Sequence, residues 1–182
     1  ERELRNIYYI EVKDKTKRNE NELKKPNNKE KTQFTSEKKH FVIKSINIGS
    51  FGGLKNFNLE FNKGLNIVYG KNEYGKSTIM AFLKMMLYGC TSKSKDIQQN
   101  NRRKYQPFDK SAMYGNIIIE INNNEYLIEK EFGKSPAYDE RHIYDKTTGK
   151  EIIFSKDYEV GEYFLSLSEE EFDKTVFAED GV

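Results

Sequence analysis

The sequence predicts an α/β fold, and three observations lead to it. Residues 70–78 fit the phosphate-binding loop (Walker A) pattern G-x-x-x-x-G-K-[ST] at every fixed position. A short apolar run, 64–69, precedes this loop, and a longer run with helical periodicity, 77–88, follows it. Alternating apolar residues elsewhere predict an antiparallel, strand-rich part beside these elements.

The elements before the loop form a series of strands. Residues 40–48 have the composition and partial alternation of a strand, and residues 50–53 contain two glycines that turn the chain. Residues 54–61 alternate strictly and predict a second strand. A tight turn at 62–64 then leads into the β-branched run 64–69, which we expect to be a buried strand.

The helix after the loop is apolar on most sides. Lys84 is the only charge between Ser77 and Tyr88, so we expect neighbouring elements to cover this helix. Gly89 is a suitable residue to end it. Cys90, the single cysteine, excludes an internal disulfide, and we interpret it as a small core residue rather than a reactive one.

Further segments extend the strand-rich part. Residues 116–121 and 125–130 predict a hairpin around three asparagines, and a second hairpin is predicted from 143–144 to 152–154. Ser168 and Glu171 form a capping box that opens a short helix, which we expect to lead into a strand over 175–178.

The loop predicts the ligand as well as the fold. Gly70 and Gly75 allow the backbone to turn tightly, so that successive N–H groups point at one anion, and the positive end of the helix dipole adds to this attraction. Lys76 is expected to reach the β- and γ-phosphates as the catalytic lysine, and the Ser77 hydroxyl is expected to ligate Mg²⁺. The predicted ligand is therefore ATP with Mg²⁺.

Composition limits the size and class of the protein. The chain has 182 residues, 36% hydrophobic and 33% charged, which suits one modest domain, and no apolar run approaches the roughly 20 residues needed to cross a membrane. We expect a cytoplasmic protein that starts at Glu1 because it is excised or processed. Residues 1–40 carry a net charge of +4, while the remainder carries −2. We expect residues 1–38 to be a linker or tail, although a basic arm for nucleic acid is an alternative, and residues 39–182 to be the domain. The run 7–12 could be a strand of an upstream domain or of this one.

Several motifs resemble those of a known family. Residues 43–48, then Phe57-x-Leu59-x-Phe61, then 64–78 resemble the amino-terminal ATPase lobe of the chromosome-maintenance (SMC) and double-strand-break-repair ATPases, which have ABC-type heads. Asn72-Glu73 and the stretch 103–107 resemble most the bacterial YhaN-type AAA ATPases, a group of predicted DNA-repair ATPases. The similarity runs from about Phe41 to the end of the chain.

This resemblance implies site residues. The nucleotide-binding residues would be Gly70, Asn72, Glu73, Tyr74, Gly75, Lys76, Ser77 and Thr78. Where the family has a glutamine that touches Mg²⁺ and the attacking water, this chain has Asp180, which could serve as an oxygen ligand or simply cap a loop. In related heads a basic loop approaches nucleotide or DNA at the position of Arg102 and Arg103. Alternatively this loop is only solvated. We expect residues 105–108 to pack against the sheet rather than stack on bases.

The resemblance also implies missing parts. Hydrolysis in this class needs an acidic pair at a strand end and a serine-glycine signature from a facing subunit, and neither is found, nor is any sustained heptad pattern. We therefore expect the amino-terminal half of a split head, whose partners are a carboxy-terminal lobe, a second head, DNA and a possible nuclease. Two alternatives stay open: a nucleotide-gated structural module with little hydrolysis, and a self-contained small P-loop kinase or nucleotidase. The second would need an acidic strand end and an arginine-bearing lid after the loop helix, and Arg102 and Arg103 alone make a poor lid.

Overall fold

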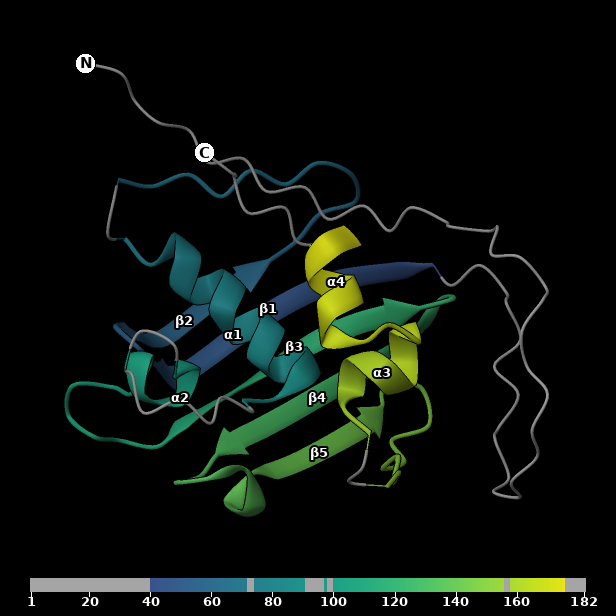
Figure 1. The fold of residues 1–182 in the computed structure, drawn as a ribbon. Coiled ribbons are helices and arrows are strands. Elements are labelled where there is room, and N and C mark those ends of the chain that lie inside the picture. Colours follow the sequence, from purple (N-terminus) through teal and green to yellow (C-terminus); the bar gives the residue numbers. More distant parts are fainter. Residues whose placement is uncertain (1–39, 72–73, 91–96, 98–99, 156–157, 176–182) are drawn as a thin grey trace, which may run out of the picture.

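A single antiparallel sheet, with helices on one of its faces, organises the protein (Figure 1). The computed structural model describes residues 40–71, 74–90, 97, 100–155 and 158–175. The sheet has five strands in the order β2-β1-β3-β4-β5. The elements are β1 (Phe41–Phe51), β2 (Leu54–Glu60), α1 (Lys76–Tyr88), α2 (Asn101–Lys104), β3 (Met113–Ile121), β4 (Asn124–Phe132), the 3-10 helix η1 (Pro136–Tyr138), β5 (Glu140–Asp145), α3 (Val160–Leu165) and α4 (Glu169–Thr175).

The two strands predicted before the loop and the first hairpin predicted after it are confirmed. Tight turns between the paired strands set their register. Gly52 turns the chain between β1 and β2 with a φ of 56°, in the left-handed region where glycine has no steric cost. Asn122 and Asn123, with φ of 48° and 68°, join β3 to β4, as expected for asparagines in a two-residue turn. Strand β1 also pairs with β3, so the two hairpins form one sheet.

The core lies between the sheet and α1. Residues of β3 alternate between buried and partly exposed, so that one face of the strand points to the helix. The Phe82 ring packs directly against Gly115 of this strand. A larger residue would not fit there, because an added Cβ would lie 2.7 Å from the Phe82 Cζ atom. Phe82 also meets Phe51 edge to face, with ring centroids 5.2 Å apart. The predicted helix, its end at Gly89 and the buried position of Cys90 are confirmed.

Ion pairs fix the helices to the sheet and to each other. Lys84 of α1 binds Asp173 and Glu169 of α4 at 2.6 and 3.1 Å. Lys130 of β4 is buried beneath the end of α1, and its Nζ donates to Glu159 at 3.0 Å. Burial lowers the pKa of Lys130, and the Glu159 carboxylate partly opposes this effect.

Three predicted elements differ from the structure or lie outside it. The second hairpin is reduced to β5 and one bridge, from Tyr144 to Glu151, and residues 152–154 form no strand. The capping box of Ser168 and Glu171 is confirmed, but Thr175 ends α4 instead of starting a strand. The expected strand at 7–12 and residues 176–178 lie outside the described residues. Within the described part, no helix is long and apolar enough to cross a membrane.

Candidate nucleotide-binding site

The second glycine of the loop has the conformation that the phosphate-loop pattern requires. Gly75 precedes α1 with φ 85° and ψ 10°, and an added Cβ would lie 2.9 Å from a methyl carbon of Leu54. Helix α1 starts at the next residue, Lys76, and no described side chain caps its first turn. The backbone N–H groups of that turn are therefore available to an anion, which the helix dipole also favours.

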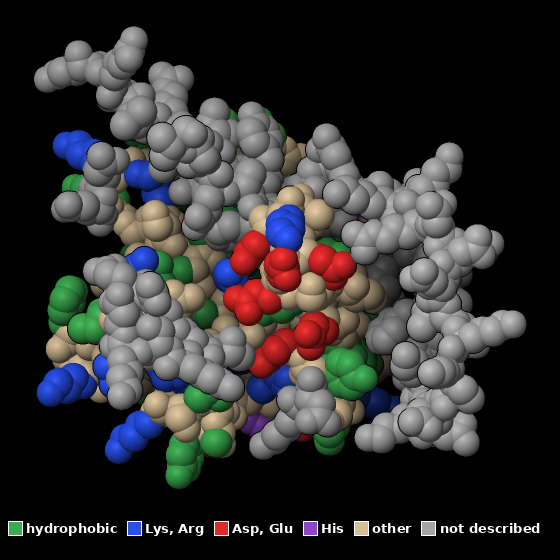
Figure 2. Space-filling view, viewed as in Figure 1, with side chains coloured by type: hydrophobic (Ala, Val, Ile, Leu, Met, Phe, Trp, Pro, Cys, Tyr) green, Lys and Arg blue, Asp and Glu red, His purple; other side chains and the backbone are tan. Residues whose placement is uncertain are grey.

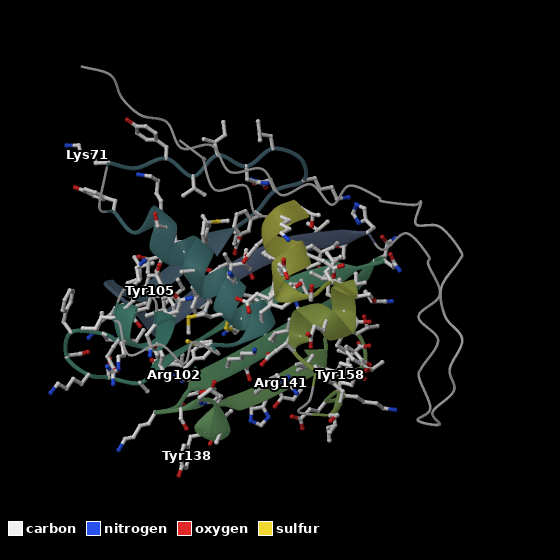
Figure 3. The ribbon with its side chains drawn as sticks, in the orientation of Figure 1. Lys71, Arg102, Tyr105, Tyr138, Arg141 and Tyr158 are labelled. Carbon is white, nitrogen blue, oxygen red and sulfur yellow. The ribbon has the colours of Figure 1, made fainter. Side chains whose placement is uncertain are left out.

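Lys76 lies over the loop in this structure. Its Nζ donates to the carbonyl oxygens of Gly70 and Lys71, at 2.5 and 2.9 Å. The ammonium group is thus held at the mouth of the loop by weak acceptors that phosphate oxygens can replace. Lys71 lies at the far end of the loop from α1 (Figure 3).

Ser77 is an exposed residue in the first turn of α1. Serine oxygen is a hard ligand of the kind that Mg²⁺ prefers, and Mg²⁺ commonly keeps several waters beside one or two protein ligands. In the part of the chain that is described, no group of three or more His, Cys, Asp or Glu could hold a metal ion. Asn72, Glu73 and Asp180, which we predicted for the site, lie outside the described residues. Tyr74 is 71% exposed and Thr78 is partly buried, and their contact with a nucleotide stays a prediction.

The buried strand predicted before the loop is wrong for this chain. Residues 65–71 have no strand conformation, and the side chains of Leu65, Ile67 and Tyr69 are 64%, 64% and 69% exposed. The turn before them does form, because the Asn66 side chain accepts from Asn62 N and donates to Asn62 O. The described sheet, in the order β2-β1-β3-β4-β5, includes no strand from this segment.

Arg102, predicted to contact nucleotide or DNA, has a structural position instead. Its guanidinium is buried and binds both carboxylate oxygens of Asp139, at 2.7 and 2.8 Å. It also donates to the carbonyl oxygens of Gly133 and Cys90, at 2.6 and 3.3 Å. These contacts join α2 to the turn between β4 and β5 (Figure 3), so Arg102 is not presented to a ligand.

Arg103 is exposed on α2, and its role as a contact to nucleotide or DNA stays a prediction. The sequence analysis did not predict α2. The sequence signal for this helix is Asn100, an N-cap residue whose side chain accepts a hydrogen bond from the Arg103 N–H. Sequence reasoning also missed Asp139, the partner of Arg102, which is distant in the chain.

The predicted packing of residues 105–108 is correct at one end and wrong at the other. Tyr105 stacks on Phe51, with ring centroids 5.1 Å apart, and its carbonyl accepts from Gly52 N at 2.7 Å. Phe108, in contrast, is 97% exposed. Tyr105 therefore packs against the sheet, whereas the Phe108 ring is in solvent.

Several known proteins are similar to this chain over part of its length. The chain is similar to the Septu protein PtuA of Bacillus thuringiensis, with 42% identity over 55 residues, which are 30% of this chain and 14% of that protein. It is 30% identical over 89 residues to the uncharacterized protein YhaN of Bacillus subtilis (strain 168), covering 48% of this chain and 8% of YhaN. It is also 28% identical over 96 residues to the DNA replication and repair protein RecF of Agathobacter rectalis, covering 53% of this chain and 25% of RecF.

The chain thus spans at most a quarter of the length of these relatives. A family described as AAA domain matches residues 42–180, which is most of the chain and includes the loop. The match, with the similarity to YhaN and RecF, supports the resemblance to the heads of SMC-like and repair ATPases, a class of nucleotide-binding ATPases. On these grounds the chain belongs to the AAA-domain family.

Proposed function

We propose that this chain binds ATP with Mg²⁺ through the loop 70–78 and is the amino-terminal lobe of an SMC-like repair ATPase head. The observation that carries the proposal is the start of α1. There Gly75 has the left-handed backbone that the loop pattern needs, and Lys76 already points across the loop. On binding, Lys76 exchanges two backbone carbonyls for phosphate oxygens, and the first-turn N–H groups donate to the same anion.

The Ser77 hydroxyl is the side-chain oxygen that would hold Mg²⁺. When bound, the ion would supply charge neutralisation for the phosphates. Ser77 is exposed beside Lys76, so its hydroxyl is open to such a ligand. Asp180 remains a proposed second ligand.

The exposed segment before the loop supports the division of the head into two lobes. Leu65, Ile67 and Tyr69 alternate along this segment and are each about two-thirds exposed, so three large apolar side chains close together in sequence are left in solvent. We infer that a strand of the carboxy-terminal lobe pairs with this segment and buries these side chains. Strand addition would pair the backbone of this segment with a strand of the other lobe.

Hydrolysis then belongs to the assembled protein. Phosphoryl transfer to water depends on positioning and on charge stabilisation, and one lobe contributes only the loop and its helix. The proposed parent dimerises head to head around two nucleotides and acts on DNA, with a nuclease as a possible partner. RecF, one of the relatives, is by its name a DNA replication and repair protein.

A two-part experiment tests this proposal. Hydrogen exchange of residues 65–69 and ATP turnover are measured before and after addition of the carboxy-terminal lobe from the parent protein. We expect slower exchange at 65–69 and turnover only in the mixture. Slower exchange without turnover would favour the nucleotide-gated structural module. Unchanged exchange would contradict the pairing of the two lobes.

The kinase alternative loses support from the position of Arg102. A kinase lid needs arginines that can close over the transferred phosphate. Arg102 is buried against Asp139 and two carbonyl oxygens, so it cannot move over the loop without breaking this network.

A further inference from the structure

The turn between β1 and β2 packs against the start of α1. On the β2 side, an added Cβ on Gly75 would lie 2.9 Å from a methyl carbon of Leu54, the first residue of β2. Within the turn, an added Cβ on Gly52 would lie 3.1 Å from the methyl carbon of Thr78. Gly75 and Thr78 both belong to the loop 70–78, so this turn borders the candidate nucleotide site.

Tyr105, the residue that ends α2, reaches the same turn. Its carbonyl oxygen accepts from the Gly52 N–H at 2.7 Å, and its Cδ1 atom would lie 3.5 Å from the added Cβ of Gly52. The space of a single methyl group therefore separates the Tyr105 ring from Thr78. Figure 3 shows Tyr105 near the end of α1 at which the loop lies.

Packing against the sheet uses only one face of the Tyr105 ring. Phe51 stacks on that face, with ring centroids 5.1 Å apart, and Phe51 is fully buried whereas Tyr105 is partly exposed. The Lys104 Nζ lies over the ring, 5.5 Å from its centroid, and thus over the face that Phe51 leaves open. Lys104 is exposed and makes no ion pair with the described residues, so a planar ligand can displace its ammonium group.

Gly53, the next residue of the turn, has no packing reason to be glycine. Its φ lies outside the left-handed region, and an added Cβ would meet no heavy atom of the described residues within 4 Å. Neither the backbone conformation nor a neighbouring side chain thus requires a glycine at this position. A glycine of this kind suits a place where a ligand comes close to the backbone.

Negative charge gathers away from the loop end of α1. Figure 2 shows acidic side chains over α3 and α4. Helix α4 packs on the last turn of α1, where the rings of Phe172 and Tyr88 have centroids 5.1 Å apart. Asp109, which lies closer to the β1–β2 turn, is paired with Lys55. An anionic ligand beside Tyr105 therefore meets the Lys104 cation and no unpaired carboxylate from Asp109.

We propose that the nucleoside of bound ATP lies over Gly53 and that its purine stacks on the open face of the Tyr105 ring. This inference rests on the proposed function, because it takes the triphosphate to be held by residues 70–78. A nucleoside that leaves the loop beside Thr78 meets Gly52, Gly53 and Tyr105 as its neighbours. Purines overlap an aromatic ring over a larger area than pyrimidines do, so the site selects purine nucleoside triphosphates.

The test is isothermal titration calorimetry of the full chain with Mg²⁺ and three ligands: ATP, CTP and inorganic tripolyphosphate, which has no nucleoside. The wild-type chain should bind ATP more tightly than the other two. Tyr105→Leu should weaken ATP binding about 5- to 150-fold and leave tripolyphosphate binding unchanged, whereas Tyr105→Phe, which keeps the ring, should retain the affinity for ATP. Gly53→Val should weaken ATP binding but not tripolyphosphate binding.

Tyr138→Leu, at an exposed tyrosine of η1, is the matched control and should bind all three ligands as the wild type does. Circular dichroism first verifies that each variant is folded. An equal loss of ATP and tripolyphosphate binding in Tyr105→Leu would overturn the proposal, since Tyr105 would then only support the loop through Gly52. Unchanged ATP binding in Tyr105→Leu, or CTP binding as tight as ATP binding, would also overturn it while the phosphate loop stands. If the folded wild type binds neither ATP nor tripolyphosphate, the proposed function itself is wrong.

Discussion

Replacing Arg102 with alanine tests whether this residue is structural. The change removes both hydrogen bonds to the Asp139 carboxylate and leaves the carbonyl oxygens of Gly133 and Cys90 without this donor. Asp139 keeps the Gly133 N–H, at 2.9 Å, as a partner. The expected result is a large loss of stability, because a half-buried carboxylate loses its counter-ion.

The magnitude follows from the burial of the pair. Breaking a fully buried ion pair costs about 3–5 kcal/mol. The side chains of Arg102 and Asp139 are 11% and 19% exposed, so solvent reduces this cost somewhat, and we expect about 2–4 kcal/mol. For a protein of this size, that corresponds to a decrease in Tm of roughly 4–16 °C.

The assay is urea denaturation of Arg102→Ala, Asp139→Ala and the double variant, with Arg103→Ala as the exposed control. We expect Arg103→Ala to change the free energy of unfolding by less than about 0.5 kcal/mol. The double variant should lose less than the sum of the single variants, because both remove one interaction. An Arg102→Ala effect no larger than that of Arg103→Ala, or strict additivity, would refute the structural assignment.

Three further predictions concern the ion pairs and the loop. Glu159→Ala should destabilise the protein by about 2–4 kcal/mol in urea denaturation, since it leaves the buried Lys130 ammonium unpaired, and adding Lys130→Met should recover most of this loss; no recovery would contradict it. Hydrogen bonds from Lys55 and Ser111 lower the pKa of Asp109 to about 2. The stabilising contribution of the Asp109 carboxylate is therefore present above pH 3.8 and is lost as pH falls through about 2. Carboxyl NMR should report this pKa, and a value near 3.8 would be inconsistent with the contacts to Lys55 and Ser111. Gly75→Ala should prevent ATP binding in calorimetry because of its φ of 85°, and wild-type affinity would be the opposing result.

The local parts of the fold could be predicted from sequence because their signals are local. Alternation predicts β1 to β4, the asparagines predict the turn between β3 and β4, and helical periodicity predicts α1. The capping box at Ser168 predicts the start of α4. Each of these features depends on residues within a few positions of one another.

The errors come from contacts that the sequence does not show. Residues 64–69 have strand composition, but a strand needs a hydrogen-bonded neighbour, and the described sheet includes no strand from this segment. Arg102 was assigned to a ligand because its partner, Asp139, is 37 residues away in the chain. Phe108 was expected to pack against the sheet with residues 105–107, but it lies in a hydrogen-bonded turn and is 97% exposed.

Isothermal titration calorimetry of ATP with Mg²⁺ is the most direct test of a nucleotide site at residues 70–78. We predict weak, measurable binding by the wild-type chain and none by Lys76→Ala, because this lysine supplies the side-chain cation of the loop. Circular dichroism verifies that the wild-type chain and Lys76→Ala are both folded. Equal binding by the two proteins, or no binding by the folded wild type at millimolar ATP, would contradict the assignment of a nucleotide site to residues 70–78.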